Sequence, residues 1–201
     1  MIGAVVLAAG QGRRFGYTPK LLSRVGRRSV IEHTLDAVVY APVRPVIVVT
    51  GRRHAIVRRA IRRQTPPAQR GIRIARNRDY RTGMASSLRT GLAALPRHCD
   101  AALVCLGDMP FVRRDDVRRL CSAWHSGVDY IRLGSAKRPG HPVLIARSLF
   151  PALAALRGDR GAQPVLDKVP DDRAGWLGGA GARDDIDTPQ ALRALRQRRR
   201  S

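Results

Sequence analysis

The chain has 201 residues, of which 44% are hydrophobic and 4% aromatic, and these values fit one globular domain with an aliphatic core. Lysine and arginine number 38 against 15 acidic residues, a formal net charge of +23, and only Lys20, Lys137 and Lys168 are lysines. Nucleic-acid binding is one interpretation of this charge. The arginines are scattered and aromatic stacking residues are scarce, which favours a compositional bias and argues against nucleic acid as the main partner. The same field would steer anionic substrates inward.

The cysteines and the apolar runs indicate the cellular compartment in which the protein is expected. Cys99, Cys105 and Cys121 are odd in number and lack metal-ligand spacing, so we expect buried thiols in a reducing environment. The apolar run at residues 2–9 is too short for a signal peptide and has no basic region before it. No apolar run is long enough to cross a bilayer. The sequence therefore predicts a soluble cytoplasmic protein without a membrane partner.

Apolar runs alternate with helical patterns in chain order. Strands are expected at residues 2–8, 45–50, 71–75, 101–106 and 128–133, and helices at about residues 29–40, 53–63, 84–95, 113–125 and 189–198. This alternation predicts an α/β fold with a mostly parallel sheet. No repeat or linker interrupts the pattern, so one domain is expected over residues 1–201, with a basic tail at 193–201.

In open α/β sheets ligands bind beyond the carboxyl ends of the strands, so loops 10–20, 76–83 and 107–111 should converge on one cleft. The first loop joins glycines to cations: Gly10, Gly12, Gly16, Arg13, Arg14 and Lys20. Glycines let backbone N–H groups approach a ligand closely, and the cations suit a polyphosphate. The sequence thus predicts a phosphate-binding loop.

Two common phosphate loops fit poorly. The Walker pattern fails because Pro19 precedes Lys20 and Leu21 follows it. The dinucleotide fingerprint misses its third glycine, where Phe15 stands, and the second strand does not end in an acidic residue. A Rossmann dehydrogenase and a plain glycine turn between strand and helix remain the alternatives.

The stretch Leu7-Ala8-Ala9-Gly10-x-Gly12-x-Arg14-Phe15-Gly16, followed by Lys20, resembles the signature of nucleotidyltransferases with the nucleotide-diphospho-sugar transferase fold. Within them it is most similar to the molybdenum cofactor cytidylyltransferase branch and its guanylyltransferase relatives, the molybdopterin-guanine dinucleotide synthases. The resemblance implies a three-layer α/β/α fold. It also implies nucleotide contacts from Leu7, Ala8, Ala9, Gly10, Gly12, Arg14 and Lys20.

Within this resemblance, Arg14 and Lys20 would be catalytic, because they would neutralise charge on departing pyrophosphate. Arg13 occupies a variable position of the motif, which leaves its part open. Relatives that use GTP have glycine where Ala9 stands, whereas those that use CTP have alanine, so the resemblance favours CTP.

Aspartates supply the candidate metal ligands. Asp108 follows the apolar run at 101–106, between Gly107 and Met109-Pro110, which aims a carboxylate rigidly into the cleft. Mg²⁺ bound to a nucleoside triphosphate needs such an oxygen, and the segment resembles the family's metal-binding stretch. Asp187, near Pro189, resembles the second metal position, with Asp185 as its competitor and helix capping as the alternative role.

Two further segments complete the candidate site. Asn77 and the run Gly83-Met84-Ala85-Ser86-Ser87-Leu88 follow the third strand, and small residues with two hydroxyls at a helix start suit a pocket for a base or ribose. The run matches the family's G-M-x-x-S pattern, which lines the nucleotide site, and capping of the helix by Ser86 is the alternative. His141 and Pro142, placed before a strand, resemble the segment that lines the acceptor side, and a structural histidine is the alternative. Asp159 could cap a helix from Arg160 or order the acceptor pocket.

The sequence therefore predicts a Mg²⁺-dependent nucleotidyltransferase that transfers CMP from CTP to the phosphate of molybdopterin cofactor and releases pyrophosphate. GTP as donor, or a sugar phosphate as acceptor, keeps the same chemistry. A non-catalytic carrier of molybdenum cofactor is the alternative of a different class, and a molybdoenzyme would be the partner that receives the product.

Overall fold

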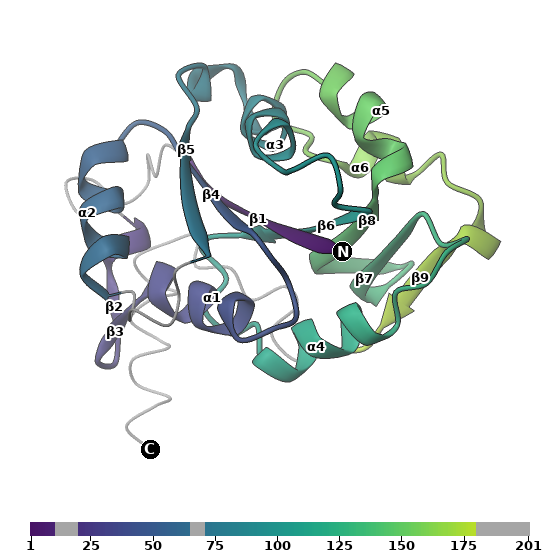
Figure 1. Ribbon diagram of the computed structural model, residues 1–201, viewed down its shortest axis with the longest axis horizontal. Coiled ribbons are helices and arrows are strands. Elements are labelled where there is room, and N and C mark those ends of the chain that lie inside the picture. The colour runs from purple at the N-terminus through teal and green to yellow at the C-terminus, as the bar shows by residue number, and fades with distance from the viewer. Residues whose placement is uncertain (11–19, 65–70, 180–201) are drawn as a thin grey trace.

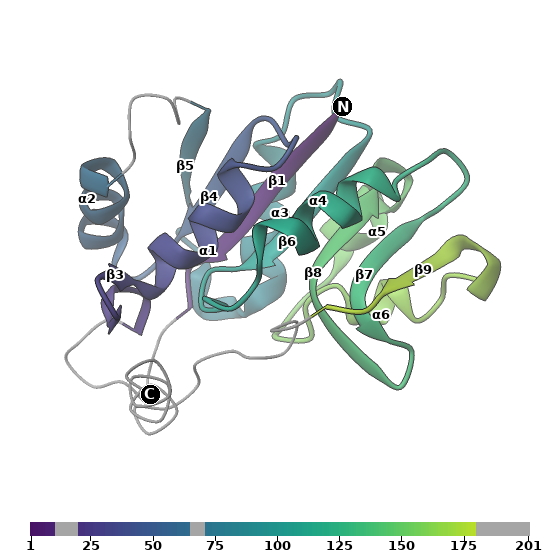
Figure 2. The same cartoon turned by 90° about the horizontal axis from the view of Figure 1, so that it is seen from below.

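The computed structural model describes residues 1–10, 20–64 and 71–179, the side chains of residues 63 and 64 excepted. A seven-stranded sheet runs through its centre in the order β5-β4-β1-β6-β8-β7-β9 (Figure 2). The first four strands in that order are parallel: β5 (Ile72–Arg76), β4 (Val46–Thr50), β1 (Ile2–Ala8) and β6 (Ala101–Leu106). Strand β8 (Arg138–Ala146) is antiparallel to β6 and to β7 (Tyr130–Ser135), and β9 (Ala174–Leu177) is parallel to β7.

Helices cover both faces of the sheet (Figure 1). One face carries α1 (Val30–Val39), α2 (His54–Gln64) and α4 (Arg114–Ser122), and the other carries α3 (Met84–Ala93), α5 (Phe150–Ala155) and α6 (Gln163–Leu166). Each face has its own apolar core, because successive residues of a strand point to opposite sides. In β1, Ala4 and Val6 belong to the first core and Val5 to the second. A strand buried on both faces reads as a continuous apolar run, which is why the sequence revealed it.

The remaining described elements are short. A two-stranded hairpin pairs β2 (Arg24–Val25) with β3 (Arg28–Ser29). The 3-10 turns are η2 (Lys20–Leu22), η4 (Tyr80–Thr82), η5 (Arg147–Leu149) and η6 (Asp171–Arg173). Among the described helices, none has both the length and the apolar content that a bilayer span requires.

The three-layer fold with a mostly parallel sheet is confirmed, and the strands expected at 2–8, 45–50, 71–75 and 101–106 match β1, β4, β5 and β6 to within one residue. Two expectations were wrong in detail. Strand β7 begins two residues later than residue 128, and His141 lies inside β8 rather than before a strand. The hairpin β2–β3 and the edge strand β9 were not predicted. The expected helix at 189–198 and the basic tail lie outside the described residues.

Candidate active site

Two segments distant in sequence meet beyond the carboxyl ends of β1 and β6. Lys20, the first residue of η2, donates a hydrogen bond from Nζ to Oδ2 of Asp108 over 2.7 Å. The side chains of Lys20 and Asp108 are 11% and 27% exposed, so the pair is largely shielded but still reachable from solvent. The structure therefore brings together the cation that follows the glycine loop and the carboxylate that follows the fourth strand of the parallel set.

The turn that carries Asp108 is fixed from two sides. The N–H of Gly107 donates to the carbonyl oxygen of Leu7 over 2.9 Å, and Thr34 donates from Oγ1 to the Gly107 carbonyl oxygen over 3.2 Å. Met109 is buried below the turn. Helix α4 begins at Arg114, so Asp108 does not cap it. The backbone that carries Asp108 is therefore tied to both β1 and α1.

The described part of the glycine loop ends at Gly10. Ala9 is 4% exposed and packs against the turn after β4, where a Cβ built on Gly51 would lie 3.0 Å from the Ala9 methyl. Ala8 is buried as well, whereas Leu7 lines the cavity described below. Gly12, Arg14 and Asp187 lie outside the described residues.

Asn77 and Ser86 form a buried polar network. Asn77 donates from Nδ2 to Oγ of Ser86 (2.8 Å) and of Ser87 (2.9 Å), and its Oδ1 accepts from the N–H of Asp79. Both Asn77 and Ser86 are 3% exposed. Their polar atoms thus hold the turn before α3, and direct contact of these side chains with a nucleotide stays a prediction.

The start of α3 is satisfied by a distant loop. Asp159 accepts from the N–H of Met84 through Oδ1 over 3.0 Å, and the Gly158 carbonyl oxygen accepts from the N–H of Ala85. Gly83 has a φ of +109°, and a Cβ there would lie 2.3 Å from the Gly158 carbonyl carbon. Asp159 therefore caps α3, not a helix from Arg160, since α6 begins at Gln163. The N–H groups of Met84 and Ala85 are consequently not free for a ligand.

A cavity of about 200 Å³ lies between α3, β7, β8 and the loop before α6. Its walls include the predicted residues Leu7, His141 and Asp159. Pro142, the residue after His141, is buried. The structure thus gathers three predicted residues from distant segments around one cavity, whereas Asn77 and Ser86 are not among the residues that line it.

Two polar residues of this cavity were not predicted. Arg132 of β7 is 4% exposed and donates from Nη1 to Oε1 of Gln163 over 2.9 Å. Both residues line the cavity. No motif marks either one, because Arg132 is one arginine among many in this chain and its burial depends on the pairing of β7 with β8. Alternation along the strand was the only sequence signal that could have found it.

His141 is held neutral by its surroundings. Burial of the ring, followed by the charge of Arg132, lowers the pKa of His141 to about 4. The carbonyl of Val104 and the carboxylate of Asp108 act in the opposite direction. At neutral pH the imidazole therefore directs its single N–H to the Val104 carbonyl, leaves a lone pair at Nδ1 and adds no positive charge to the cavity.

A divalent metal in a protein is held by several oxygen, nitrogen or sulfur donors. Within residues 1–10, 20–64 and 71–179, no three His, Cys, Asp or Glu side chains cluster closely enough to hold a metal. Asp108 supplies one hard oxygen donor, which fits Mg²⁺ or Mn²⁺ bound to a nucleoside triphosphate, since phosphate and water oxygens complete such a shell. A second carboxylate from Asp187 stays a prediction.

This fold and this site together define the nucleotidyltransferase class, with the nucleotide-diphospho-sugar transferase fold. The family model described as "MobA-like NTP transferase domain" matches residues 4–174. The chain belongs to this family.

Two curated proteins illustrate the range of similar sequences. The chain is 32% identical over 183 residues to the nicotine blue oxidoreductase of Paenarthrobacter nicotinovorans, which covers 88% of this chain and 84% of that protein. It is also 32% identical over 176 residues to the bifunctional protein GlmU of Azorhizobium caulinodans. That match covers 86% of this chain but 38% of GlmU, so the chain spans about two fifths of the bifunctional protein.

Solved structures agree with the family. Rv0371c of Mycobacterium tuberculosis H37Rv superposes with a TM-score of 0.81 at 28% identity, over 98% of this chain and 97% of that one. A complex of Rv0371c with manganese gives 0.77 at 26% identity, over 98% of both chains. A nucleotidyl transferase from Methanothermobacter thermautotroptrophicus gives 0.81 at 27% identity, over 98% of this chain and 97% of that one. A divalent metal has thus been observed in a similar protein.

Proposed function

We propose that the protein transfers CMP from CTP to the phosphate of molybdopterin cofactor, with Mg²⁺ and with release of pyrophosphate. The observation that carries this proposal is the 2.7 Å pair between Lys20 and Asp108 at the carboxyl edge of the sheet. It joins the end of the glycine loop to the aspartate that resembles the family's metal ligand. Such a pair supplies one group for phosphate and one for a metal.

The reaction moves one nucleotidyl group, the CMP unit. An oxygen of the acceptor phosphate forms a bond with the α-phosphorus, the bond from that phosphorus to the bridging oxygen breaks, and pyrophosphate carries away the electron pair. The bound metal would neutralise charge on the triphosphate. Asp108 would hold that metal, and Lys20 would exchange its carboxylate partner for a phosphate oxygen when the nucleotide binds.

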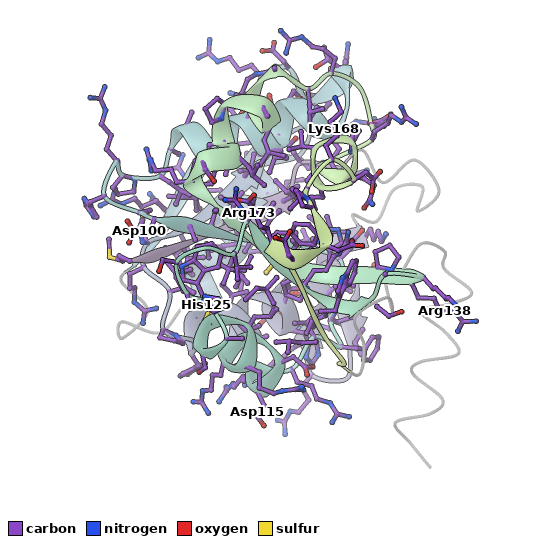
Figure 3. The ribbon with its side chains drawn as sticks, turned by 90° about the vertical axis from the view of Figure 1, so that its right-hand side faces the viewer. Asp100, Asp115, His125, Arg138, Lys168 and Arg173 are labelled. Atoms are coloured by element: carbon purple, nitrogen blue, oxygen red, sulfur yellow. The ribbon has the colours of Figure 1, made fainter. Side chains whose placement is uncertain are left out.

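The test is pyrophosphate release measured with each nucleoside triphosphate, with and without molybdopterin cofactor. Replacement Asp108→Ala removes the carboxylate at the proposed metal position and should lower kcat/KM by on the order of a hundredfold or more. Asp115→Ala is the matched control, because this aspartate is exposed and projects outward from α4 (Figure 3). Full activity of Asp108→Ala would remove the metal assignment.

The choice of CTP rests on Ala9 and on the resemblance alone. The Ala9 methyl packs inside the protein, so it would act on the base through the path of the loop that follows. Tighter binding of GTP than of CTP in calorimetry would reverse this choice. A sugar phosphate that supports pyrophosphate release better than molybdopterin cofactor would replace the acceptor. Tight binding of the cofactor without turnover would indicate a carrier.

A second candidate follows from the relative named nicotine blue oxidoreductase, which the chain matches over 84% of that protein's length. The cavity walls include Leu88, Val104 and Leu166, so an apolar ring system is compatible with it. This candidate predicts a redox change of nicotine blue in the presence of a supplied electron donor or acceptor, measured by absorbance. It also predicts no pyrophosphate release with any triphosphate, which separates it from the first proposal.

A further inference from the structure

Arg132 is a buried cation whose hydrogen-bond partners are uncharged. Its Nε and Nη2 donate to the carbonyl oxygen of Gly140 over 3.1 and 2.9 Å, and its Nη1 donates to Oε1 of Gln163 over 2.9 Å. None of the ion pairs found in the described part of the chain includes it. A buried guanidinium without a directly paired anion is costly, because its hydration is lost and the nearby carboxylate of Asp167 acts on it only from beyond ion-pair distance.

The guanidinium also has unused capacity. Of its five N–H groups, three are engaged in the bonds above, which leaves one on each terminal nitrogen. Arg132 lines the cavity of about 200 Å³, so these groups border a space that can hold a ligand. Two N–H groups on one planar guanidinium can bind two oxygens of a phosphate or a carboxylate.

A second polar group in the same cavity is unpartnered. Nδ1 of His141 is buried and has no hydrogen-bond partner within the described part of the chain. His141 lines the cavity with Arg132 and lies within electrostatic range of both Arg132 and Asp108. Leu7, which precedes the glycine loop, belongs to the same wall. The cavity therefore adjoins the proposed nucleotide site.

We propose that this cavity binds an oxyanion group of the acceptor, a phosphate or a carboxylate, and that Arg132 is its principal ligand. Nδ1 of His141, the unprotonated nitrogen of the neutral ring, would accept a hydrogen bond from a protonated oxygen of the same ligand group. Gln163 positions Arg132, and its own amide donates to Oδ1 of Asp167. The assignment of the oxyanion to an acceptor rests on the proposed function; the binding site itself does not.

The competing explanation is structural: Arg132 ties the Gly140 backbone of β8 to α6. The chain offers a matched control in Arg147, which donates from Nη1 to the carbonyl oxygens of Pro96 (3.2 Å) and Cys99 (2.9 Å). Arg147 also lies 5.4 Å from the ring of Phe150, as Arg132 lies 5.7 Å from Trp176. It follows the last residue of β8, at the opposite end from His141.

The experiment uses the full chain with Trp124→Phe, so that Trp176 beside Arg132 reports on the cavity. Emission is followed while inorganic phosphate and, separately, acetate are added. Saturable binding of phosphate or of acetate identifies the kind of oxyanion. Arg132→Gln should raise the dissociation constant by about tenfold to a hundredfold, as expected for loss of charge-assisted hydrogen bonds. Arg147→Gln should leave it unchanged.

Several results would overturn the inference. One is the absence of saturable binding for both anions. Another is an anion dissociation constant that Arg132→Gln leaves unchanged. A third is an equal loss of anion affinity in Arg132→Gln and Arg147→Gln. If Arg132→Gln fails to fold, Arg132→Lys is used instead, because lysine keeps the positive charge but lacks the paired N–H groups of the guanidinium. An unchanged anion dissociation constant in Arg132→Lys would contradict the site. Arg138→Gln is a further control, since Arg138 points outward from the far end of the β7–β8 hairpin (Figure 3).

The kinetic experiment separates this inference from the proposed function. With an active enzyme, Arg132→Gln should raise KM for the acceptor by about tenfold or more and leave KM for the triphosphate unchanged. Pyrophosphate release with unaltered acceptor KM would reject the Arg132 site alone. Arg132-dependent anion binding without pyrophosphate release from any triphosphate would reject the proposed function and keep the site.

Discussion

At the scale of single residues, His141 shows how the cavity controls protonation. Burial is the main reason that its pKa falls to about 4, and the neighbouring Arg132 charge acts in the same direction. A protonated ring would place a second cation beside Arg132 in a space that water reaches poorly. The neutral ring is therefore the form that the folded protein stabilises.

This shift predicts a pH-dependent stability. In the unfolded chain a histidine has a pKa of about 6.5, so between pH 6.5 and 4 the unfolded state binds more protons than the folded state. The contribution of His141 is complete above pH 6.5 and should fall by about 3 kcal/mol as the pH approaches 4. Urea unfolding at stepped pH measures it.

The control for this prediction is a second histidine. His141→Gln should remove that part of the pH slope, whereas His125→Gln should retain it, since His125 is exposed in the turn after α4. An identical slope in wild type and His141→Gln would show that the ring titrates normally in the folded protein.

Some residues of the candidate site could be predicted from their local sequence, and others could not. Lys20 and Asp108 stand in local motifs, so their residue types and neighbours were sufficient to select them. Arg132 has no such marker, because its importance arises from burial between β7 and the cavity. The direct nucleotide contacts expected from Asn77 and Ser86 stay predictions, since the hydrogen-bond partners of a polar side chain depend on loops that are distant in sequence.

At the scale of elements, the beginning of α3 depends on the loop at Gly158 and Asp159. These two residues accept from the first N–H groups of the helix, which otherwise lack partners. The loop also forms part of the cavity wall through Asp159. The docking of α3 and the shape of the cavity are consequently coupled.

Gly83→Ala tests this coupling. The new Cβ would lie 2.3 Å from the Gly158 carbonyl carbon and would also sit at a φ of +109°. We expect the free energy of unfolding to fall by roughly 3 kcal/mol or more, for two reasons. The Gly158 backbone must move to make room for the new Cβ, and alanine is strained at this positive φ. Gly127→Ala, with a φ of +98° and no atom within 4 Å, should lose only about 1 kcal/mol. Urea unfolding of both variants measures the difference, and equal losses would mean that the contact with Gly158 is not tight.

The elements also show why part of the fold escaped prediction. Strands β1, β4 and β6 are continuous apolar runs, so composition alone marked them. The order of β8, β7 and β9 depends on pairing between segments distant in sequence. Only two residues separate β7 from β8, and so short a connection allows only an antiparallel pair. The sequence did not reveal this hairpin, because Arg138 and Pro139 at the start of β8 are typical of a loop.

At the scale of the whole molecule, the net charge of +23 is the dominant feature. Residues 37–78 contain eleven arginines and no acidic residue, and they include α2 and the edge strand β5. Charged side chains on an edge strand discourage pairing with another chain. Such a field also attracts anions over distances comparable to the Debye length, which is about 8 Å at physiological salt.

The field predicts that a nucleoside triphosphate associates faster at low salt. The association rate of CTP, measured by stopped-flow fluorescence, should fall about tenfold between roughly 20 and 300 mM salt, because steering is screened. Replacing Arg58, Arg59 and Arg62 on the exposed side of α2 by glutamate should flatten this dependence without touching the site. Cytidine, which carries no phosphate, is the ligand control and should show little change. A CTP rate independent of salt would mean that the arginines act locally and do not guide the substrate.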